Sequence, residues 1–536
     1  MKKDIIRTFS VLLVLTAGMP AQTIWDRTVD TSWYTSDPRV DSLNISTAEQ
    51  LAGLARLVSN GVNFRNRTIT LSNDIMLNDT SGWQNWSNGY NSPLPFNRWT
   101  PIGNSRRVFR GTFDGAGFVI SGMFAIDNDY DSDDGFGLFG NVEDGTIKNL
   151  GVIASIVLGY KYVGSLVGRS TGDRSIITNC YATGNVFGNE LVGGLAGSAY
   201  TITNSYATGN VLKEDRWAVR LAGGLAGSAN TITNSYATGN VSGKNHVGGL
   251  AGVAGTITNS YATGNVSGEN SVGGLAGGAR TITNSYATGN VSGENYVGGL
   301  AGIDFVGFGG GGTIFTITNS YATGNVSGEN YVGGLAGTNI TWFLETIVTI
   351  TNSYATGNVS GENYVGGLLG TNLAGLVGIF GATIFTITNS YYNNSTIGAI
   401  NYTNNIGTPK TTEEMKQRVT YVDWDFTNIW FIDEGNDYPR VRGFANGTFV
   451  SKDIINRSGK TAQAPQITVR GKMLNIKEAT NSELHIKLID LKGKTQATFK
   501  TSGSGSFPLR TISAGRYIVE IKESGKRVNS SAIVLP

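Results

Sequence analysis

The chain has 536 residues, of which 75 are Gly, about twice the usual share, while only 15% are charged. The formal net charge of +2 gives no electrostatic reason to expect a nucleic-acid partner. A single cysteine, Cys180, excludes a disulfide framework and a cysteine-rich metal site, and two histidines, His246 and His485, exclude any site that needs three imidazoles.

The first residues predict an export signal. A basic start that includes Lys2 and Lys3 precedes the short apolar run 9–15, and small residues follow up to Ala21. The alternative is a membrane anchor, but so short a run cannot cross a hydrocarbon layer of about 30 Å. We therefore expect residues 1–21 to be a signal peptide and no later segment to form a transmembrane helix.

Internal repeats occupy the middle of the chain. The string VGGLAG and its looser copies mark nine units between Leu138 and Leu368. It alternates with TITNSYATGNV or a close variant, whose tyrosines are spaced by 25 residues or by 25 plus an insertion. These tyrosines are Tyr181, Tyr206, Tyr236, Tyr261, Tyr286, Tyr321, Tyr354 and Tyr391.

Each unit predicts β-structure. TITNSYATGNV is rich in β-branched residues and alternates, as a strand does. The Gly pair of VGGLAG can bend the chain so that its Val and Leu both point inward, and SGEN has a turn composition. No unit has enough apolar surface to fold alone, so stacking of identical units predicts an all-β parallel β-solenoid with one coil per 25 residues.

One asparagine of each unit would form a column along the axis. Stacked Asn amides can hydrogen-bond from coil to coil, which favours a structural ladder over a binding site. The residues of this column are Asn204, Asn234, Asn259, Asn284, Asn319, Asn352 and Asn389.

The units resemble the GLUG motif of bacterial surface and secreted proteins, which also occurs beside IgA-specific metallopeptidases. Segment 46–123, with a short helix that starts at Ser46 or Thr47, is similar to the region that begins such solenoids. The resemblance implies an N-terminal capping region over 22–134, repeats over 135–395 and a closing segment over 396–445. It implies little about activity, because the motif occurs on proteins of different activity.

The tail has a different pattern. From Gln466 the sequence alternates as antiparallel strands do, and it carries a net charge of +7 against −5 for the rest of the chain. The strings LHIKLIDLKGK and ISAGRYIVEI resemble the C-terminal sorting domain of type IX secretion. The resemblance implies a β-sandwich over 466–536 behind a linker over 446–465, and export through the outer-membrane secretion machinery of a Gram-negative bacterium. The alternative is an ordinary small β-sandwich used for adhesion.

The sequence offers little for catalysis. A metallopeptidase of the resembling kind needs H-E-x-x-H, and neither histidine has that spacing. A β-helix polysaccharide lyase or glycoside hydrolase is the alternative, and hydrolysis needs two carboxylates at a fixed separation. Asp133 and Asp134 are adjacent on one loop, and Asp114 lies in a turn that an aspartate usually supports. We therefore expect a protein without catalytic activity or a bound cofactor.

Two acidic features could hold Ca²⁺, because both are rich in carboxylate oxygen. The first is the string DNDYDSDDG, with candidate ligands Asp127, Asp129, Asp131 and Asp133. Counting from Asp129, the twelfth position is Gly140 rather than Glu, so the string is not an EF-hand and a solvated acidic loop is the alternative. The second is a column of turn residues, either bridged by cations or simply solvated: Glu269, Glu294, Glu329 and Glu362.

Three apolar insertions leave the repeats at the same corner of successive units. An exposed apolar cluster usually marks a ligand or partner surface, whereas the alternative is a local cap. We therefore expect a non-catalytic adhesin or binding scaffold for glycans or for envelope or matrix proteins, secreted or on the cell surface. The candidate interaction residues are Phe305, Phe308, Trp342, Phe343, Leu344, Leu376 and Phe380.

Overall fold

The computed structural model describes residues 23–442 and 466–535 with short gaps. The gaps are 89–95, 128–132, 214–218, 304–312, 339–345, 372–376, 379–380, 400–402, 405, 471–472, 478–482, 491–494, 503–504, 509–514 and 524–525. The predicted signal peptide and the whole of the predicted linker therefore lie outside the described residues. The chain divides into two compact units, residues 1–454 and 455–536, and each is described by itself.

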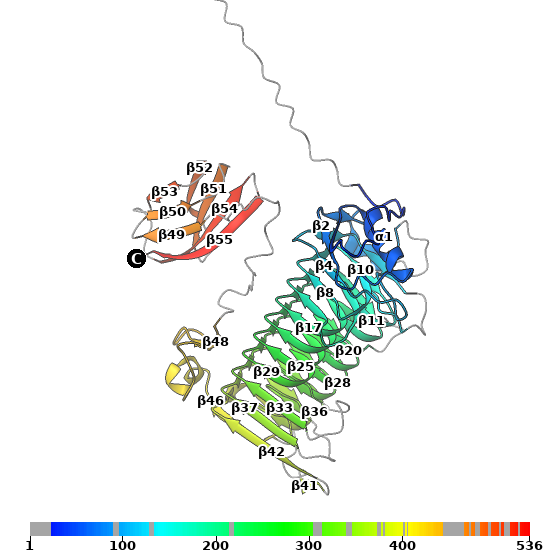
Figure 1. Cartoon of the computed structure of the whole chain (residues 1–536). Helices are drawn as coiled ribbons and strands as arrows, with labels where there is room; N and C mark the ends of the chain where they lie inside the picture. Colours follow the sequence, from blue (N-terminus) through cyan, green and yellow to red (C-terminus); the bar gives the residue numbers. More distant parts are fainter. Residues whose placement is uncertain are drawn as a thin grey trace, which may run out of the picture. The chain divides into compact units, whose positions relative to one another are not determined.

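The larger unit is a parallel β-solenoid, as the repeats predict. Each coil contributes one strand in turn to each of four sheets, which stack along one axis (Figure 1). In one coil these strands are β13 (Ile176–Thr178), β14 (Tyr181–Ala182), β15 (Asn185–Gly188) and β16 (Glu190–Gly193). The chain then enters β17 (Ala196–Thr203), which pairs in parallel with β13 and starts the next coil.

The first two sheets are named here by their outward-facing residues. The threonine sheet contains β13 and β17 together with β1 (Ser42–Ile45), β2 (Thr68–Leu71), β4 (Thr112–Asp114), β7 (Phe139–Glu143), β8 (Thr146–Lys148), β12 (Val167–Thr171), β21 (Ala226–Thr233), β25 (Ala251–Thr258), β29 (Ala276–Thr283), β33 (Thr313–Thr318), β37 (Thr346–Thr351), β42 (Gly381–Thr388) and β41 (Val377–Gly378). The tyrosine sheet contains β14 together with β3 (Ile75–Met76), β5 (Val119–Ser121), β9 (Gly151–Ile153), β18 (Tyr206–Ala207), β22 (Tyr236–Ala237), β26 (Tyr261–Ala262), β30 (Tyr286–Ala287), β34 (Tyr321–Ala322), β38 (Tyr354–Ala355), β43 (Tyr391–Asn393) and β46 (Thr408–Lys410).

The other two sheets complete each coil. One contains β15 together with β6 (Phe124–Ile126), β10 (Ile156–Leu158), β19 (Val211–Lys213), β23 (Val241–Ser242), β27 (Val266–Ser267), β31 (Val291–Ser292), β35 (Val326–Ser327), β39 (Val359–Gly361) and β44 (Ile397–Ala399). The other contains β16 together with β11 (Lys161–Gly164), β20 (Arg220–Gly223), β24 (Asn245–Gly248), β28 (Asn270–Gly273), β32 (Asn295–Gly298), β36 (Asn330–Gly333), β40 (Asn363–Gly366) and β45 (Thr403–Asn404). The stacked sheets thus extend beyond residues 135–395 in both directions.

The string TITNSYATGNV does not form one strand, so that prediction is wrong. In the unit that contains Asn204, the threonine sheet ends at Thr203 and the tyrosine sheet begins at Tyr206. Asn204 has a φ of 50°, in the left-handed region that Asn tolerates better than most residues. The asparagine therefore makes a corner, and the string contributes to three different sheets, because its last residue, Val211, begins β19.

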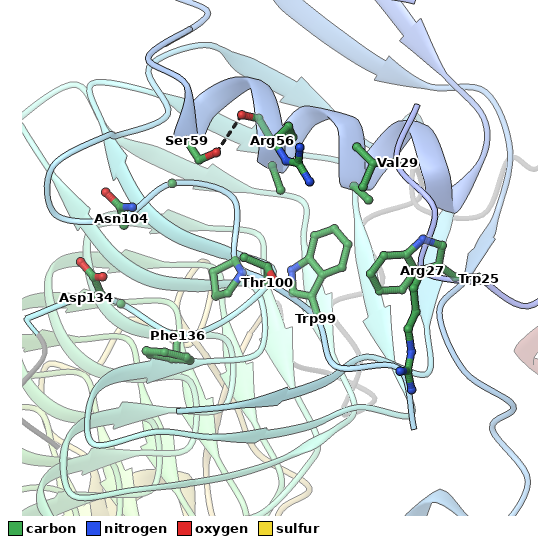
Figure 2. Close-up of a pocket in the computed structure, with 15 residues that line it drawn as sticks. Trp25, Arg27, Val29, Arg56, Ser59, Trp99, Thr100, Asn104, Asp134 and Phe136 are labelled. Carbon is green, nitrogen blue, oxygen red and sulfur yellow. Dashed lines mark hydrogen bonds between the residues drawn. The ribbon is translucent and has the colours of Figure 1, made fainter. Parts of the chain in front are cut away.

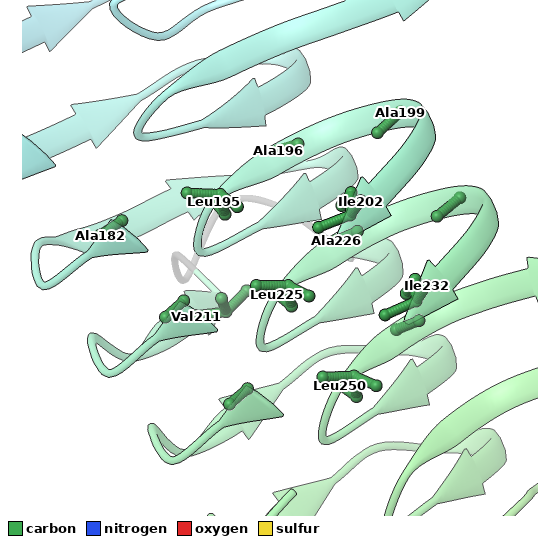
Figure 3. Packing of buried hydrophobic residues seen from close by; sticks show 14 of the residues in the cluster. Ala182, Leu195, Ala196, Ala199, Ile202, Val211, Leu225, Ala226, Ile232 and Leu250 are labelled. Carbon is green, nitrogen blue, oxygen red and sulfur yellow. The ribbon is translucent and has the colours of Figure 1, made fainter. Parts of the chain in front are cut away.

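The inward-facing residues form continuous columns (Figure 3). Val192 and Leu195 of one VGGLAG string are both fully buried, which confirms that the Gly pair turns them inward. A Cβ on Gly193 would lie 2.1 Å from the carbonyl oxygen of Ala196 and 2.6 Å from the Cα of Ala226. Glycine is therefore required there because neighbouring coils approach too closely for any side chain.

The predicted asparagine ladder is confirmed from Asn204 to Asn352. Its last predicted member, Asn389, does not join it, because the Oδ1 of Asn352 has no hydrogen-bond partner among the described residues. The Nδ2 of Asn234 donates to the Oδ1 of Asn204 at 3.1 Å, and the next rungs repeat this bond at 3.1–3.3 Å. A second ladder that the sequence did not suggest runs through Asn245, where the Nδ2 of Asn270 donates to its Oδ1 at 3.0 Å. Both columns link the coils along the axis.

A helix covers the N-terminal end of the solenoid (Figure 1). α1 (Ala48–Ser59) is preceded by Thr47, whose Oγ1 accepts the backbone N–H of Gln50 at 3.3 Å, as the predicted N-cap requires. Its buried Leu51 and Leu54 belong to the same core as the first coils. A 3₁₀ helix, η1 (Trp83–Asn88), follows in the connecting segment.

The chain after the last coil lies against the tyrosine sheet rather than across its end. The sequence predicts a closing segment over 396–445, and the name closing segment is kept here for its part over residues 411–442. This part contains η4 (Glu414–Lys416), η5 (Arg418–Thr420) and an antiparallel pair, β47 (Trp430–Phe431) with β48 (Arg440–Val441). A third short helix, η3 (Asn394–Thr396), precedes it.

The smaller unit is antiparallel, as its alternating sequence predicts. One sheet contains β49 (Gln466–Arg470), β50 (Met473–Lys477) and β53 (Gly505–Pro508), and the other contains β51 (Glu483–Asp490), β52 (Thr495–Ser502), β54 (Gly515–Glu523) and β55 (Lys526–Leu535). Ile486 and Leu488 are buried, whereas His485 is only partly buried and alternates with them. Among the described residues of the chain, no helix is long and apolar enough to span a membrane.

Candidate binding site

A pocket of about 410 Å³ lies between α1 and the loops that lead into the first coils (Figure 2). Trp25 and Trp99 line one side, and Arg56, Asn104 and Asp134 line the rest. The pocket thus brings together residues from four separate stretches of sequence. Of these residues, only Asp134 was considered as a functional candidate from the sequence.

Trp25 and Trp99 form the aromatic wall of the pocket, and hydrogen bonds to the backbone hold both indoles in place. The indole N–H of Trp25 donates to the carbonyl of Thr28 at 2.9 Å, and that of Trp99 donates to the carbonyl of Leu138 at 3.1 Å. The two rings meet edge to face with centroids 5.8 Å apart. Both N–H groups are already bonded to the backbone, so the wall is apolar, but Trp25 and Trp99 are only 7% and 4% exposed and a small part of their surface is open to a ligand.

The polar wall combines fixed and available groups. The Oδ1 of Asn104 accepts the backbone N–H of Arg107 at 2.8 Å, and a carboxylate oxygen of Asp134 accepts that of Ser105 at 2.7 Å. Arg56, in the last turn of α1, is exposed, and its guanidinium makes no hydrogen bond or ion pair with the residues that the structure describes. The guanidinium is therefore the group best placed to donate to a ligand.

This arrangement suits binding of a polar molecule that carries rings. The small open part of the indole wall can contact the apolar face of such a ring, and a guanidinium donates to hydroxyl or carboxylate oxygens. Asp134 is the one carboxylate among the lining residues, whereas glycoside hydrolysis uses two.

The predicted calcium loop is described only in part. Asp133 forms an ion pair with Lys161 at 2.8 Å, and this hydrogen bond lowers the pKa of Asp133. Asp127 is buried, while Asp129 and Asp131 lie outside the described residues. Within the described part of the chain, no three His, Cys, Asp or Glu residues are grouped so that they could hold a metal ion. The calcium site stays a prediction.

The other acidic candidates have structural surroundings. Asp114 accepts the backbone N–H of Ala116 at 2.9 Å and the side chain of Asn149 at 3.0 Å, which confirms its role in the turn. In the glutamate column, Glu269 lies 3.3 Å from Lys244. The next three members, Glu294, Glu329 and Glu362, are exposed, as solvated turn residues are.

The predicted interaction residues of the insertions all lie outside the described residues. The described ends of the insertions extend the threonine sheet, where Ile303, Phe315 and Val348 are fully buried and join the main core. Ile314, next to Phe315, is 58% exposed. The insertions therefore begin and end as parts of the core, and their function as an interaction surface stays a prediction.

A stacked tyrosine column runs along the tyrosine sheet, and the sequence did not assign it a role. From Tyr181 to Tyr354, successive rings stack with centroids 4.7–5.1 Å apart and planes within 10°. The closing segment covers the column from Tyr261 onward, and buried Trp430 packs against it. The repeated tyrosines are visible in the sequence, but nothing in residues 411–442 repeats with them, so their cover could not be predicted.

Comparison with known proteins agrees with this architecture. The model of the GLUG motif matches residues 159–186, 188–212, 243–267 and 328–360. The molecule is thus a parallel β-solenoid that contains GLUG repeats.

A search of curated proteins found no match. Among solved structures, the chain is similar to a proposed immunoglobulin A1 protease from Bacteroides ovatus, at 18% identity over 75% of this chain and 92% of that chain. The TM-score is 0.27, which is too low to support any conclusion about function.

Proposed function

We propose that the protein is a non-catalytic binding scaffold, an adhesin that holds glycans or envelope or matrix proteins. The observation that carries this proposal is the pocket beside α1, with two tryptophans on one side and the guanidinium of Arg56 on the other. A binding function needs complementarity of this kind and no acid–base pair.

The proposal is tested with the full chain against a panel of neutral and acidic oligosaccharides by isothermal titration calorimetry. Arg56→Ala is the test variant, because the side chain is exposed and its loss leaves the core intact. Arg65→Ala is the matched control, because Arg65 is equally an exposed arginine but does not line the pocket.

We expect at least one oligosaccharide to bind, Arg56→Ala to weaken binding about tenfold or more, and Arg65→Ala to leave it unchanged; tenfold corresponds to about 1.4 kcal/mol. Unchanged binding by Arg56→Ala would place the binding site elsewhere. Release of reducing or unsaturated sugar ends during incubation would instead make the protein a carbohydrate-active enzyme.

We propose further that residues 466–536 direct export to the outside of a Gram-negative cell through the type IX secretion machinery. Their separate compact unit, their antiparallel sheets and their charge of +7 support a module distinct from the solenoid. Deleting them should leave the solenoid folded but stop the protein from appearing outside the cells of its native host. Normal delivery of the truncated chain would refute the sorting function.

A further inference from the structure

The outer face of the threonine sheet carries two parallel columns of threonine. Seven consecutive strands, from β17 to β42, each contain the string Thr-Ile-Thr. The isoleucine points inward: it is fully buried in the first six strands and partly buried in the last. Its two neighbours therefore point outward. They are Thr201, Thr203, Thr231, Thr233, Thr256, Thr258, Thr281, Thr283, Thr316, Thr318, Thr349, Thr351, Thr386 and Thr388.

The columns are in exact register along the solenoid. Thr201 pairs with Thr231 and Thr203 with Thr233, and the same pairing continues through every following strand to β42. Neighbouring strands are about 4.8 Å apart and alternate residues about 6.6 Å apart along a strand. The fourteen threonines thus form a two-dimensional lattice of about 4.8 by 6.6 Å that extends about 29 Å along the axis.

The array is uniform in chemistry as well as in spacing. Threonine is β-branched, so its side chain is stiff and the hydroxyl and methyl of each copy can point the same way. Each of the fourteen side chains is partly or fully exposed. Among the described residues, the one hydrogen bond to these hydroxyls is from Asn230 to the Oγ1 of Thr231, at 3.4 Å. The hydroxyls are therefore available to solvent.

The array has a clear boundary. On β13, the preceding strand, Ile176 replaces the first threonine. On the next two strands, β8 and β4, the outward position is charged, with Lys148 and Asp114 in an ion pair at 3.2 Å. The neutral lattice is therefore confined to the strands of the regular repeats.

We propose that this face binds ice, an ordered lattice of water. Fixed hydroxyls can hold water oxygens at the spacing of the protein lattice, and the methyl groups between them leave no charge to disturb the order. Oxygen atoms on the prism face of hexagonal ice repeat at similar distances along two perpendicular directions. A neutral, flat and periodic face offers little to a charged or irregular ligand. This function is independent of the pocket beside α1.

The test uses the full chain in two assays, incorporation into a slowly growing ice hemisphere and inhibition of ice recrystallisation. The test variant is Thr258→Tyr with Thr283→Tyr, which places two bulky side chains at the centre of the lattice. The matched control is Thr263→Tyr, the same substitution at an exposed position outside the array and only five residues from Thr258. A second test variant, Thr256→Lys with Thr281→Lys, removes the neutrality without adding a ring.

We expect the wild-type chain and Thr263→Tyr to enter the ice and suppress recrystallisation, and both double variants to lose most of that activity at an unchanged melting temperature. Exclusion of the wild-type chain from ice would overturn the proposal. So would full activity in both double variants, or retention of the wild-type chain on crystalline cellulose or chitin without activity on ice.

Discussion

The tyrosine column has an uncovered half, Tyr181 to Tyr236, and a covered half, Tyr261 to Tyr391. The two halves differ in the exposure of their rings although their repeats are nearly identical. Tyr206 and Tyr236 are half-buried, whereas Tyr321 and Tyr354 are 6% and 1% exposed. The rings stack alike in both halves, 4.7 Å apart in the first pair and 5.1 Å in the second. The difference comes from the closing segment, which covers the column from Tyr261 onward.

The comparison separates two levels of information in the sequence. Inward residues and glycines of the repeat determine the coil, because each must match its copy one coil away. The exposure of the outer residues depends on segments outside the repeat, such as residues 411–442. A solenoid of this kind can therefore vary its surface while its core stays constant.

The largest expected effect is on the core that both halves share. Val247 lies in the uncovered half and Val297 in the covered half, and both are fully buried in the same column. Val247→Asp and Val297→Asp should each destabilise the protein by several kcal/mol, because each buries an unpaired carboxylate. Denaturant unfolding measures this. A loss confined to one variant would show that the two halves do not share one core.

A smaller loss of stability is expected from a substitution in the closing segment. Trp430 is fully buried between the closing segment and the column. Trp430→Ala should lower the stability of that segment by about 3–5 kcal/mol, the usual cost of a large-to-small change in a core. Tryptophan fluorescence should then reveal an early unfolding transition that leaves the strands of the repeats folded. A single transition, shifted as a whole, would show that the cover and the coils unfold together.

The stacked tyrosines of both halves should lose their protons only at high pH. Burial, and then the neighbouring Tyr261, raises the pKa of Tyr236 to about 12, and burial raises that of Tyr354 further. The folded state thus keeps protons that the unfolded state loses, so stability is intact below pH 10 and falls as the pH rises above it. Tyrosinate absorbance should show the stacked rings of both halves ionising only well above pH 10, with Tyr206 of the uncovered half included. Ionisation of all stacked tyrosines near pH 10 in the folded protein would contradict this.

The smallest effect on stability is expected from the insertion tips, which occur only in the covered half. Trp342→Ser with Phe343→Ser should leave the melting temperature within a few degrees, because the tips lie outside the repeated core. The double variant should weaken adhesion or self-association by about a kcal/mol or more, as lost aromatic anchors do. Lower stability with unchanged binding would make the insertions a structural cap.

Much of the fold followed from the sequence because repetition multiplies each local signal. The 25-residue period predicted the solenoid, and the inward turn of Val192 and Leu195 and the ladder through Asn204 are confirmed. The corner at each ladder asparagine was missed, because alternation alone does not distinguish a straight strand from one broken by a left-handed residue.

The pocket could not be predicted in the same way. Trp25, Arg56 and Trp99 lie outside the repeats and have no copies in other coils. Arg56 is 31 residues after Trp25, and Trp99 is 43 residues after Arg56. Only the folding of α1 against the first coils brings them together. Contacts of this kind have no period, so single residues in non-repeated segments carry no visible signal.

The central claim is that both halves share one core and that only one of them is covered by the closing segment. Its most direct test is hydrogen–deuterium exchange of wild type and Trp430→Ala, resolved by mass spectrometry. In the wild type, the central strands β21 and β37 should be protected alike. In the variant, exchange should rise in residues 411–442 and in β34 and β38, while β21 and β37 stay protected. Loss of protection in β37 as well would contradict the account, because the core of the second half would then depend on its cover.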